Sequence, residues 1–156
     1  MPKASLVSVV EDDQFFRESM RRLMRSFGYT VEAFPSAADF LASPRLVETG
    51  CLIVDVHMPR MTGLELHRHL IEIGHAIPTI LVTAYPDIDV RTRALTDGVV
   101  CYLRKPVDEN SAHITFCGVK PGIGALGRRD LCAVKEPEAT PKPKFMGHSH
   151  CPRSTL

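Results

Sequence analysis

The chain has 156 residues, of which 44% are hydrophobic and 24% charged, and its formal net charge is +1. These values fit one soluble globular domain with some residues left over. We expect neither a secreted nor a membrane-spanning protein, because the sequence shows no secretory signal and no apolar stretch of roughly 18 residues. The five cysteines are odd in number and irregularly spaced, so we expect no disulfide framework and a reducing, cytoplasmic location.

The first part of the chain alternates between short apolar runs and segments with helical spacing. Residues 6–10 form an apolar run, and apolar side chains then recur at helical spacing over residues 15–27, before Gly28. A second strand is predicted over residues 30–34, and Ser36 can cap a short helix that follows it. This part therefore predicts two strands, each followed by a helix.

The same alternation continues further along the chain. The predicted elements are a strand over 51–54, a helix over 64–71, a strand over 78–82, a helix over 87–95 and a strand over 99–103. Strands that alternate with helices of about ten residues indicate βαβ units and a parallel sheet. The strands show little polar alternation, which agrees, because both faces of such a sheet are covered.

Gly and Pro residues interrupt the pattern in the last third of the chain. Residues 111–156 contain five Gly and five Pro and have no sustained period; only Ile114, Phe116 and Val119 hint at a strand. These residues include 7 Lys/Arg against 3 Asp/Glu, whereas residues 1–110 include 12 against 15. We therefore expect a domain over 1–110, followed by a disordered, basic, Gly/Pro-rich tail over 111–156.

Polar and charged residues follow four of the predicted strands. They are Glu11, Asp12 and Asp13 after the first strand, Asp55 after the third, Thr83 after the fourth, and Lys105 after the fifth. Ligands bind beyond the carboxyl ends of strands in open α/β sheets, and these four strands are expected to be neighbours. The sequence therefore predicts that at least three carboxylates share one crevice.

Several carboxylates in one crevice favour a bound cation. Two like charges about 4 Å apart repel by roughly 4 kcal/mol at an effective dielectric near 20, and oxygen ligands with positions left for water and phosphate describe a Mg²⁺ site. An aspartate, a metal, an ammonium and a hydroxyl are the groups that phosphoryl transfer requires. Each residue alone has an ordinary structural explanation, such as a helix cap or a solvated lysine; their occurrence together at successive strand ends favours the functional interpretation.

Four motifs in order resemble the receiver domains of two-component response regulators. They are Val9–Asp13, Asp55–Gly63, Thr83–Ala84 and Tyr102–Pro106. The segment after Asp55 looks like the class that precedes a LuxR-type helix-turn-helix output domain. The resemblance covers about residues 5–110 and implies an α/β, flavodoxin-like, doubly wound, five-stranded parallel sheet in the order 2-1-3-4-5, here with an atypical or missing fifth helix.

The resemblance also implies a metal site. Asp55 would be both the phosphoacceptor and a metal ligand. Asp12 would bind Mg²⁺ directly, Glu11 would assist through water, and the backbone carbonyl of His57 would complete the protein ligands. Asp13 would be the third acid, outside the ligand set, although the sequence leaves open whether Asp13 rather than Glu11 joins the acid pair.

A switch is implied by the same resemblance. Thr83 and Lys105 would contact the phosphoryl group, and Tyr102 would turn inward when Thr83 moves. The phosphodonor would be a sensor histidine kinase, and the domain would catalyse its own phosphorylation and dephosphorylation without being a turnover enzyme. Dimerisation would use the face formed by the fourth helix and fifth strand; no DNA or membrane contact is expected from this chain.

Two departures from the family pattern concern the end of the chain. Gly118, Pro121 and Gly122 should not continue a fifth helix, and no output domain is recognisable in the tail. An out-of-frame or replaced tail is one hypothesis, and a natural single-domain receiver is the other. A zinc site formed by tail cysteines and histidines, such as Cys132 and His148, matches no common spacing.

Two other functions compete with the signalling interpretation. A phosphatase that uses an aspartyl-phosphate intermediate needs a second acid two residues after the nucleophile, and His57 occupies that position. A pseudo-receiver that only binds partners should have lost an acid or the equivalent of Lys105, and neither is lost. A truncated receiver that acts as a protein-interaction module is a further alternative.

Overall fold

The computed structural model describes residues 6–118, with side chains described up to His113. Its strands are β1 (Leu6–Val10), β2 (Thr30–Phe34), β3 (Thr49–Asp55), β4 (Thr79–Thr83) and β5 (Cys101–Arg104). Its helices are α1 (Gln14–Ser26), α2 (Ala37–Leu41), α3 (Gly63–Glu72), α4 (Ile88–Thr96) and α5 (Glu109–Gly118), with a 3-10 turn at Leu46–Glu48. The predicted βαβ alternation is confirmed.

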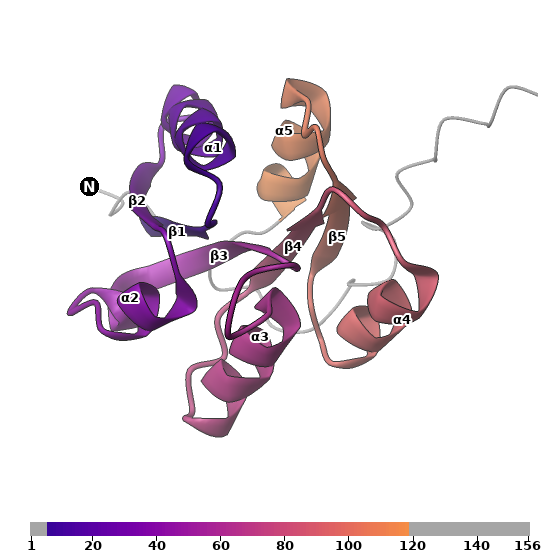
Figure 1. Ribbon diagram of the computed structural model, residues 1–156. Helices are drawn as coiled ribbons and strands as arrows, with labels where there is room; N and C mark the ends of the chain where they lie inside the picture. The colour runs from indigo at the N-terminus through magenta and orange to yellow at the C-terminus, as the bar shows by residue number, and fades with distance from the viewer. Residues whose placement is uncertain (1–5, 119–156) are drawn as a thin grey trace, which may run out of the picture.

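All neighbouring strands are parallel, in the order β2-β1-β3-β4-β5. Helices α1 and α5 cover one face of the sheet, and α2, α3 and α4 cover the other (Figure 1). This is the doubly wound arrangement that the sequence predicted. None of the helices described between residues 6 and 118 has both the length and the apolar character needed to cross a bilayer.

The strands are apolar on both faces because each face supplies half of the core. Ile53 packs in the cluster on the side of α1 and α5, whereas its neighbours Leu52 and Val54 pack on the side of α2, α3 and α4. The largest fully buried side chain, Phe40 of α2, belongs to the second cluster. Successive strand residues point to opposite faces, so a continuous apolar run is what two covered faces require.

The fifth helix is present, which corrects the prediction that it could be missing and the hint of a strand at Ile114 and Phe116. Asp108 caps α5, since its carboxylate accepts a hydrogen bond of 2.7 Å from the backbone N–H of Ser111. Ala112 is fully buried in the cluster that α1 covers. The cap and this burial outweigh the weak local helix preference of the β-branched and aromatic residues.

Helix α5 also crosses the domain boundary predicted at residue 110 and ends at Gly118. The remaining tail, from residue 119 onward, lies outside the described residues, together with the candidate zinc ligands Cys132 and His148. The division of the chain into a domain and a tail therefore stays a prediction.

Candidate phosphoacceptor site

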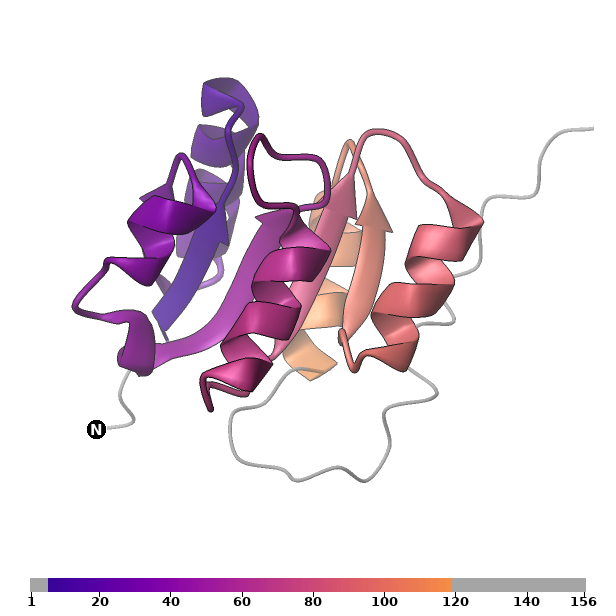
Figure 2. The same ribbon diagram turned by 60° about the horizontal axis from the view of Figure 1, so that its bottom comes forward.

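The strand register brings the predicted site residues to one edge of the sheet. Val10 of β1 lies opposite Val54 of β3, and Asp55 lies opposite Val82 of β4. The residues that follow, Glu11 and Thr83, therefore flank Asp55. The carboxyl ends of all five strands lie at this edge (Figure 2). The topology alone accounts for the convergence of residues far apart in the sequence.

Three carboxylates meet there. One oxygen from each of Glu11, Asp12 and Asp55 lies within 4.8 Å of the others. Glu11 and Asp55 are buried, at 1% and 6% exposure, whereas Asp12 is exposed. Asp13 lies outside this cluster, because its carboxylate accepts the backbone N–H of Phe16 at 2.9 Å and so caps α1. The geometry therefore pairs Glu11, not Asp13, with Asp12.

Arg17 holds the acidic loop in place. Its guanidinium donates to the backbone carbonyl of Glu11 at 2.7 Å and reaches that of Asp12 at 3.4 Å. The backbone N–H of Glu11 donates to the carbonyl of Phe34 at 3.0 Å. Both interactions use backbone groups, so they fix the loop and leave the carboxylates free to face the cluster.

Lys105 supplies a positive charge to the cluster. Its Nζ lies 2.7 Å from Oε2 of Glu11 and 3.6 Å from Oδ2 of Asp55. The same Nζ lies 4.2 Å from the centre of the Phe16 ring. The Lys105 side chain is only 16% exposed, so these contacts are poorly screened by water. Lys105 is thus the cation that faces two buried acids.

Burial raises the pKa of the Glu11 carboxyl to about 7 from its ordinary value of 4.5. Hydrogen bonds from Lys105 and from the backbone N–H of Asp13 oppose the shift, and the negative charge of Asp55 adds to it. The cluster therefore carries more negative charge than a single ammonium can stabilise. A hard divalent cation fits this set of oxygen donors, and Glu11, Asp12 and Asp55 are the residues that could hold it.

Thr83 is fully buried beside the acids, but its hydroxyl is engaged elsewhere. The hydroxyl donates to the carbonyl of Tyr85 at 3.2 Å and accepts the Tyr85 N–H at 3.0 Å. Tyr102 is half-buried, and its phenolic oxygen accepts the backbone N–H of Asp87 at 3.3 Å. Both predicted switch residues are therefore bonded to the loop between β4 and α4.

His57 lies above Asp55 at the surface. Its backbone N–H donates to Oδ1 of Asp55 at 3.4 Å, which orients the carboxylate. Its imidazole is exposed and meets the ring of Tyr85 edge-on, with the ring centres 6.2 Å apart. The loops after β3 and β4 thus touch directly across the site.

Gly63 is a residue of this site whose role the sequence analysis missed. A Cβ at Gly63 would collide with the carbonyl oxygen of Asp55 and would lie 3.0 Å from Cδ2 of Leu81. The Gly63 N–H donates to the carbonyl of Val56 at 3.1 Å. The capping box formed by Thr62 and Glu65 begins α3 at this point. The spacing of Thr62 and Glu65 is typical of a capping box, and it was the sequence signal that could have placed Gly63 at the start of a helix.

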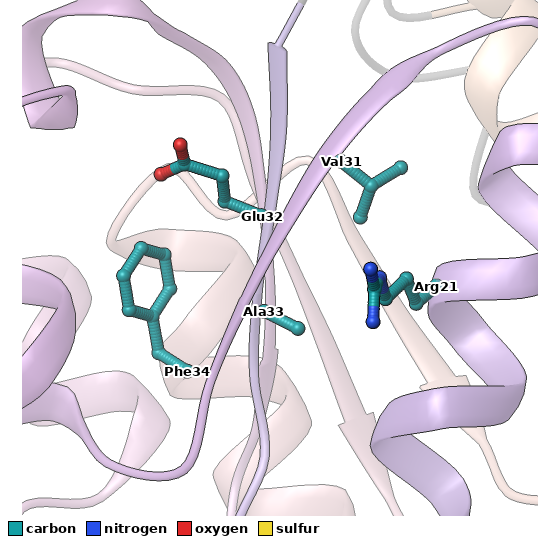
Figure 3. Close-up of a pocket in the computed structure, with 5 residues that line it drawn as sticks. All are labelled: Arg21, Val31, Glu32, Ala33 and Phe34. Carbon is teal, nitrogen blue, oxygen red and sulfur yellow. The ribbon is translucent and has the colours of Figure 1, made fainter.

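A hollow of about 310 Å³ lies away from this site, at the edge strand β2. It is lined by Arg21, Val31, Glu32, Ala33 and Phe34 (Figure 3). Glu32 and Phe34 project to one side of the strand, whereas Val31 and Ala33 project to the other, toward Arg21 (Figure 3). Glu32 already pairs with Arg45 at 2.7 Å. This hollow gathers no converging reactive groups.

Comparison with known proteins agrees with this geometry. The family model described as the response regulator receiver domain matches residues 7–115. The response regulator protein TodT of Pseudomonas putida is 39% identical over 107 residues, which are 69% of this chain and 47% of TodT. The transcriptional regulatory protein FixJ of Azorhizobium caulinodans is 36% identical over 109 residues, 70% of this chain and 52% of FixJ. The chain thus matches about half the length of these relatives.

Solved structures show the same fold. The structure titled FixJ-N superposes with a TM-score of 0.68 at 30% identity and covers 78% of this chain and 97% of that one. A response regulator receiver protein from Burkholderia phymatum gives a TM-score of 0.64 at 39% identity, over 78% of this chain and 98% of that one. By sequence, fold and the arrangement of its strand ends, the chain belongs to the response regulator receiver domain family.

Proposed function

We propose that this receiver domain accepts a phosphoryl group on Asp55 from a phosphohistidine of a sensor kinase. Mg²⁺ would be held by Asp12, Asp55 and the backbone carbonyl of His57, with Glu11 assisting through water. The observation that carries the proposal is the buried Asp55 carboxylate, which lies within 4.8 Å of two other acids and has Lys105 Nζ 3.6 Å from its Oδ2. Such a cluster of like charges is costly without a bound cation, and ionisable groups with perturbed pKa values gathered in this way are typical of functional sites.

In the transfer, an Asp55 carboxylate oxygen forms a bond to phosphorus while the phosphorus–nitrogen bond of the donor breaks. The electron pair leaves with the imidazole nitrogen, which then takes up a proton. Lys105 neutralises charge on the phosphoryl oxygens, and the N–H of His57 keeps the other Asp55 oxygen oriented. Bound Mg²⁺ would supply further charge neutralisation. Attack of water on phosphorus then breaks the bond between phosphorus and the Asp55 oxygen, which releases inorganic phosphate and restores the Asp55 carboxylate.

The switch follows from the present partners of Thr83. Its hydroxyl can donate to a phosphoryl oxygen only if it leaves the carbonyl of Tyr85. Release of Tyr85 frees the loop before α4, which is also bonded to Tyr102 through Asp87. Phosphorylation adds nearly two negative charges and three acceptor oxygens, so a local charge event reorganises the face of α4 and β5.

The proposal also includes a cytoplasmic location for the protein. It further includes homodimerisation through the face formed by α4 and β5. Ile88 and Leu95 of α4 are 70% and 36% exposed, and Tyr85 in the preceding loop is 76% exposed. Large exposed apolar side chains on α4 and on the loop before it support an interaction surface. Equilibrium sedimentation with and without phosphorylation tests this part separately; an unchanged monomer would oppose it.

Incubation with Mg²⁺ and acetyl phosphate, read by intact mass, tests the proposed function. We expect one phosphoryl group per chain, and none when EDTA removes the metal. Rapid multiple turnover of a simple phosphomonoester would favour a phosphatase instead. A folded chain that takes no label under any condition would favour a pseudo-receiver and contradict the proposal.

A further inference from the structure

The ammonium of Lys105 lies against an aromatic ring as well as against two acids. The face of the Phe16 ring lies 4.2 Å from Nζ, beside the carboxylates of Glu11 and Asp55 at 2.7 and 3.6 Å. The two acids are also the groups that a metal ion and a phosphoryl group would engage. Neither the metal ion nor the phosphoryl group would bind the Phe16 ring, so the contact between this ring and Lys105 can persist when both are bound.

Phe16 is held in place by both its backbone and its side chain. Its backbone N–H donates to the Asp13 carboxylate at 2.9 Å, so it forms part of the α1 cap. Its half-buried ring packs against the core cluster that contains Val9 and Met20. The adjacent Phe15 is 86% exposed. The ring of Phe16 is therefore a fixed surface, whereas the neighbouring ring points to solvent.

An aromatic face suits a catalytic ammonium for a physical reason. The negative face of the ring attracts the charge without being a strong hydrogen-bond acceptor. The three N–H donors of a lysine can then remain directed at oxygen atoms. The attraction is larger where water is excluded, and the Lys105 side chain is only 16% exposed.

We propose that Phe16 is a positioning residue for phosphoryl transfer: its ring keeps the Lys105 ammonium beside Asp55 after the acids have turned to the metal and the phosphoryl group. This inference rests on the proposed function of Asp55. A lysine stem has four rotatable carbons and samples many rotamers when it has no fixed partner. Loss of the aromatic face therefore lowers the fraction of molecules with Nζ in position, and leaves the three metal-binding acids in place.

The test compares Phe16→Leu, which keeps an apolar side chain, with Phe16→Tyr, which keeps the aromatic face. Phe15→Leu is the matched control, because it makes the same change at the exposed neighbour. The readout is the rate of labelling by acetyl phosphate as a function of Mg²⁺ concentration. We expect Phe16→Leu to lower the rate at saturating Mg²⁺ about fivefold, with the half-saturating Mg²⁺ concentration within about twofold of the wild-type value. Phe16→Tyr and Phe15→Leu should retain the wild-type rate.

A purely structural role for Phe16 would give a different result. If Phe16→Leu labels at the wild-type rate, or if Phe16→Tyr loses as much as Phe16→Leu, the proposal is wrong. Should Phe16→Leu unfold, site-specific trifluorophenylalanine at position 16 decides the question, since it keeps the ring shape and weakens the negative face; an unchanged rate overturns the proposal. A wild-type chain that takes no label overturns both proposals, whereas normal wild-type labelling with an unaffected Phe16→Leu overturns this one alone.

Discussion

Substitution of Gly63 by Ala should damage both the stability and the chemistry of this domain. Gly63 is the first residue of α3, and its N–H donates to the carbonyl of Val56 at 3.1 Å. An added Cβ would collide with the carbonyl oxygen of Asp55 and would lie 3.1 Å from the carbonyl carbon of that residue. Asp55 is the last residue of a central strand, so its backbone cannot move without disturbing β1 and β4.

The expected cost follows from this geometry. Relief requires the N-terminus of α3 to move away from β3, and the added Cβ would also crowd the side chain of Leu81 at 3.0 Å. Forced overpacking of this kind typically costs about 1–3 kcal/mol, and we expect the Gly63→Ala change to lie near the upper end because the obstructing atoms are backbone. The Asp55 carboxylate would shift with its backbone, so the labelling rate should fall by at least about tenfold.

Urea unfolding and acetyl phosphate labelling together check this expectation, with Gly74→Ala as the control. Gly74 has a φ of +85° and nothing within 4 Å of an added Cβ, so an alanine there would bring backbone strain without a collision. Gly74→Ala should cost about 1 kcal/mol and leave labelling unchanged. Equal effects of the two changes on labelling, or a Gly63→Ala protein as stable as the wild type, would refute the reasoning.

Three further predictions concern charged and polar groups. Because the pKa of Glu11 is raised, its contribution to the stability of the metal-free protein is fully present below pH 4.5 and should be lost as pH rises through about 7. The loss should be on the order of 3 kcal/mol in the free energy of unfolding. Urea unfolding in EDTA should show this fall in stability, and Glu11→Gln should flatten the pH dependence. His67→Ala should lower the free energy of unfolding by about 2–4 kcal/mol, because the buried ring is hydrogen-bonded to the Thr79 hydroxyl at 3.0 Å and donates to the carbonyl of Asp97 at 3.1 Å. Arg68→Ala, which removes an exposed ion pair to Asp97, should cost less than about 1 kcal/mol. Equal costs would contradict this account. Asp13→Ala should lower the urea midpoint through loss of the α1 cap, and unchanged labelling would confirm that this acid is no metal ligand.

Much of the fold could be predicted because the sheet is parallel. The bounds of β1 and β2 match the predicted ranges. Strand β1 is buried along its whole length and reads as a nearly continuous apolar run, whereas the edge strand β2 carries Glu32. The convergence of Glu11, Asp55 and Lys105 also followed from topology, because parallel strands end at one edge.

The remainder depends on contacts between segments far apart in the chain. The approach of Gly63 to Asp55 and the contact of Phe16 with Lys105 arise only when three elements pack together. Helix α5 was underestimated for a related reason: its cap at Asp108 and the burial of Ala112 depend on the sheet that it covers. The helix and strand propensities of single residues do not include such contacts between distant segments.

The most direct measurement compares wild type and Asp55→Asn in acetyl phosphate with Mg²⁺, followed by mapping of the phosphorylated peptide. The account predicts one acid-stable, base-labile acyl phosphate on the peptide that contains Asp55, and no label in the variant. Undiminished labelling of Asp55→Asn, or a phosphoryl group located on another residue of the wild type, would contradict it.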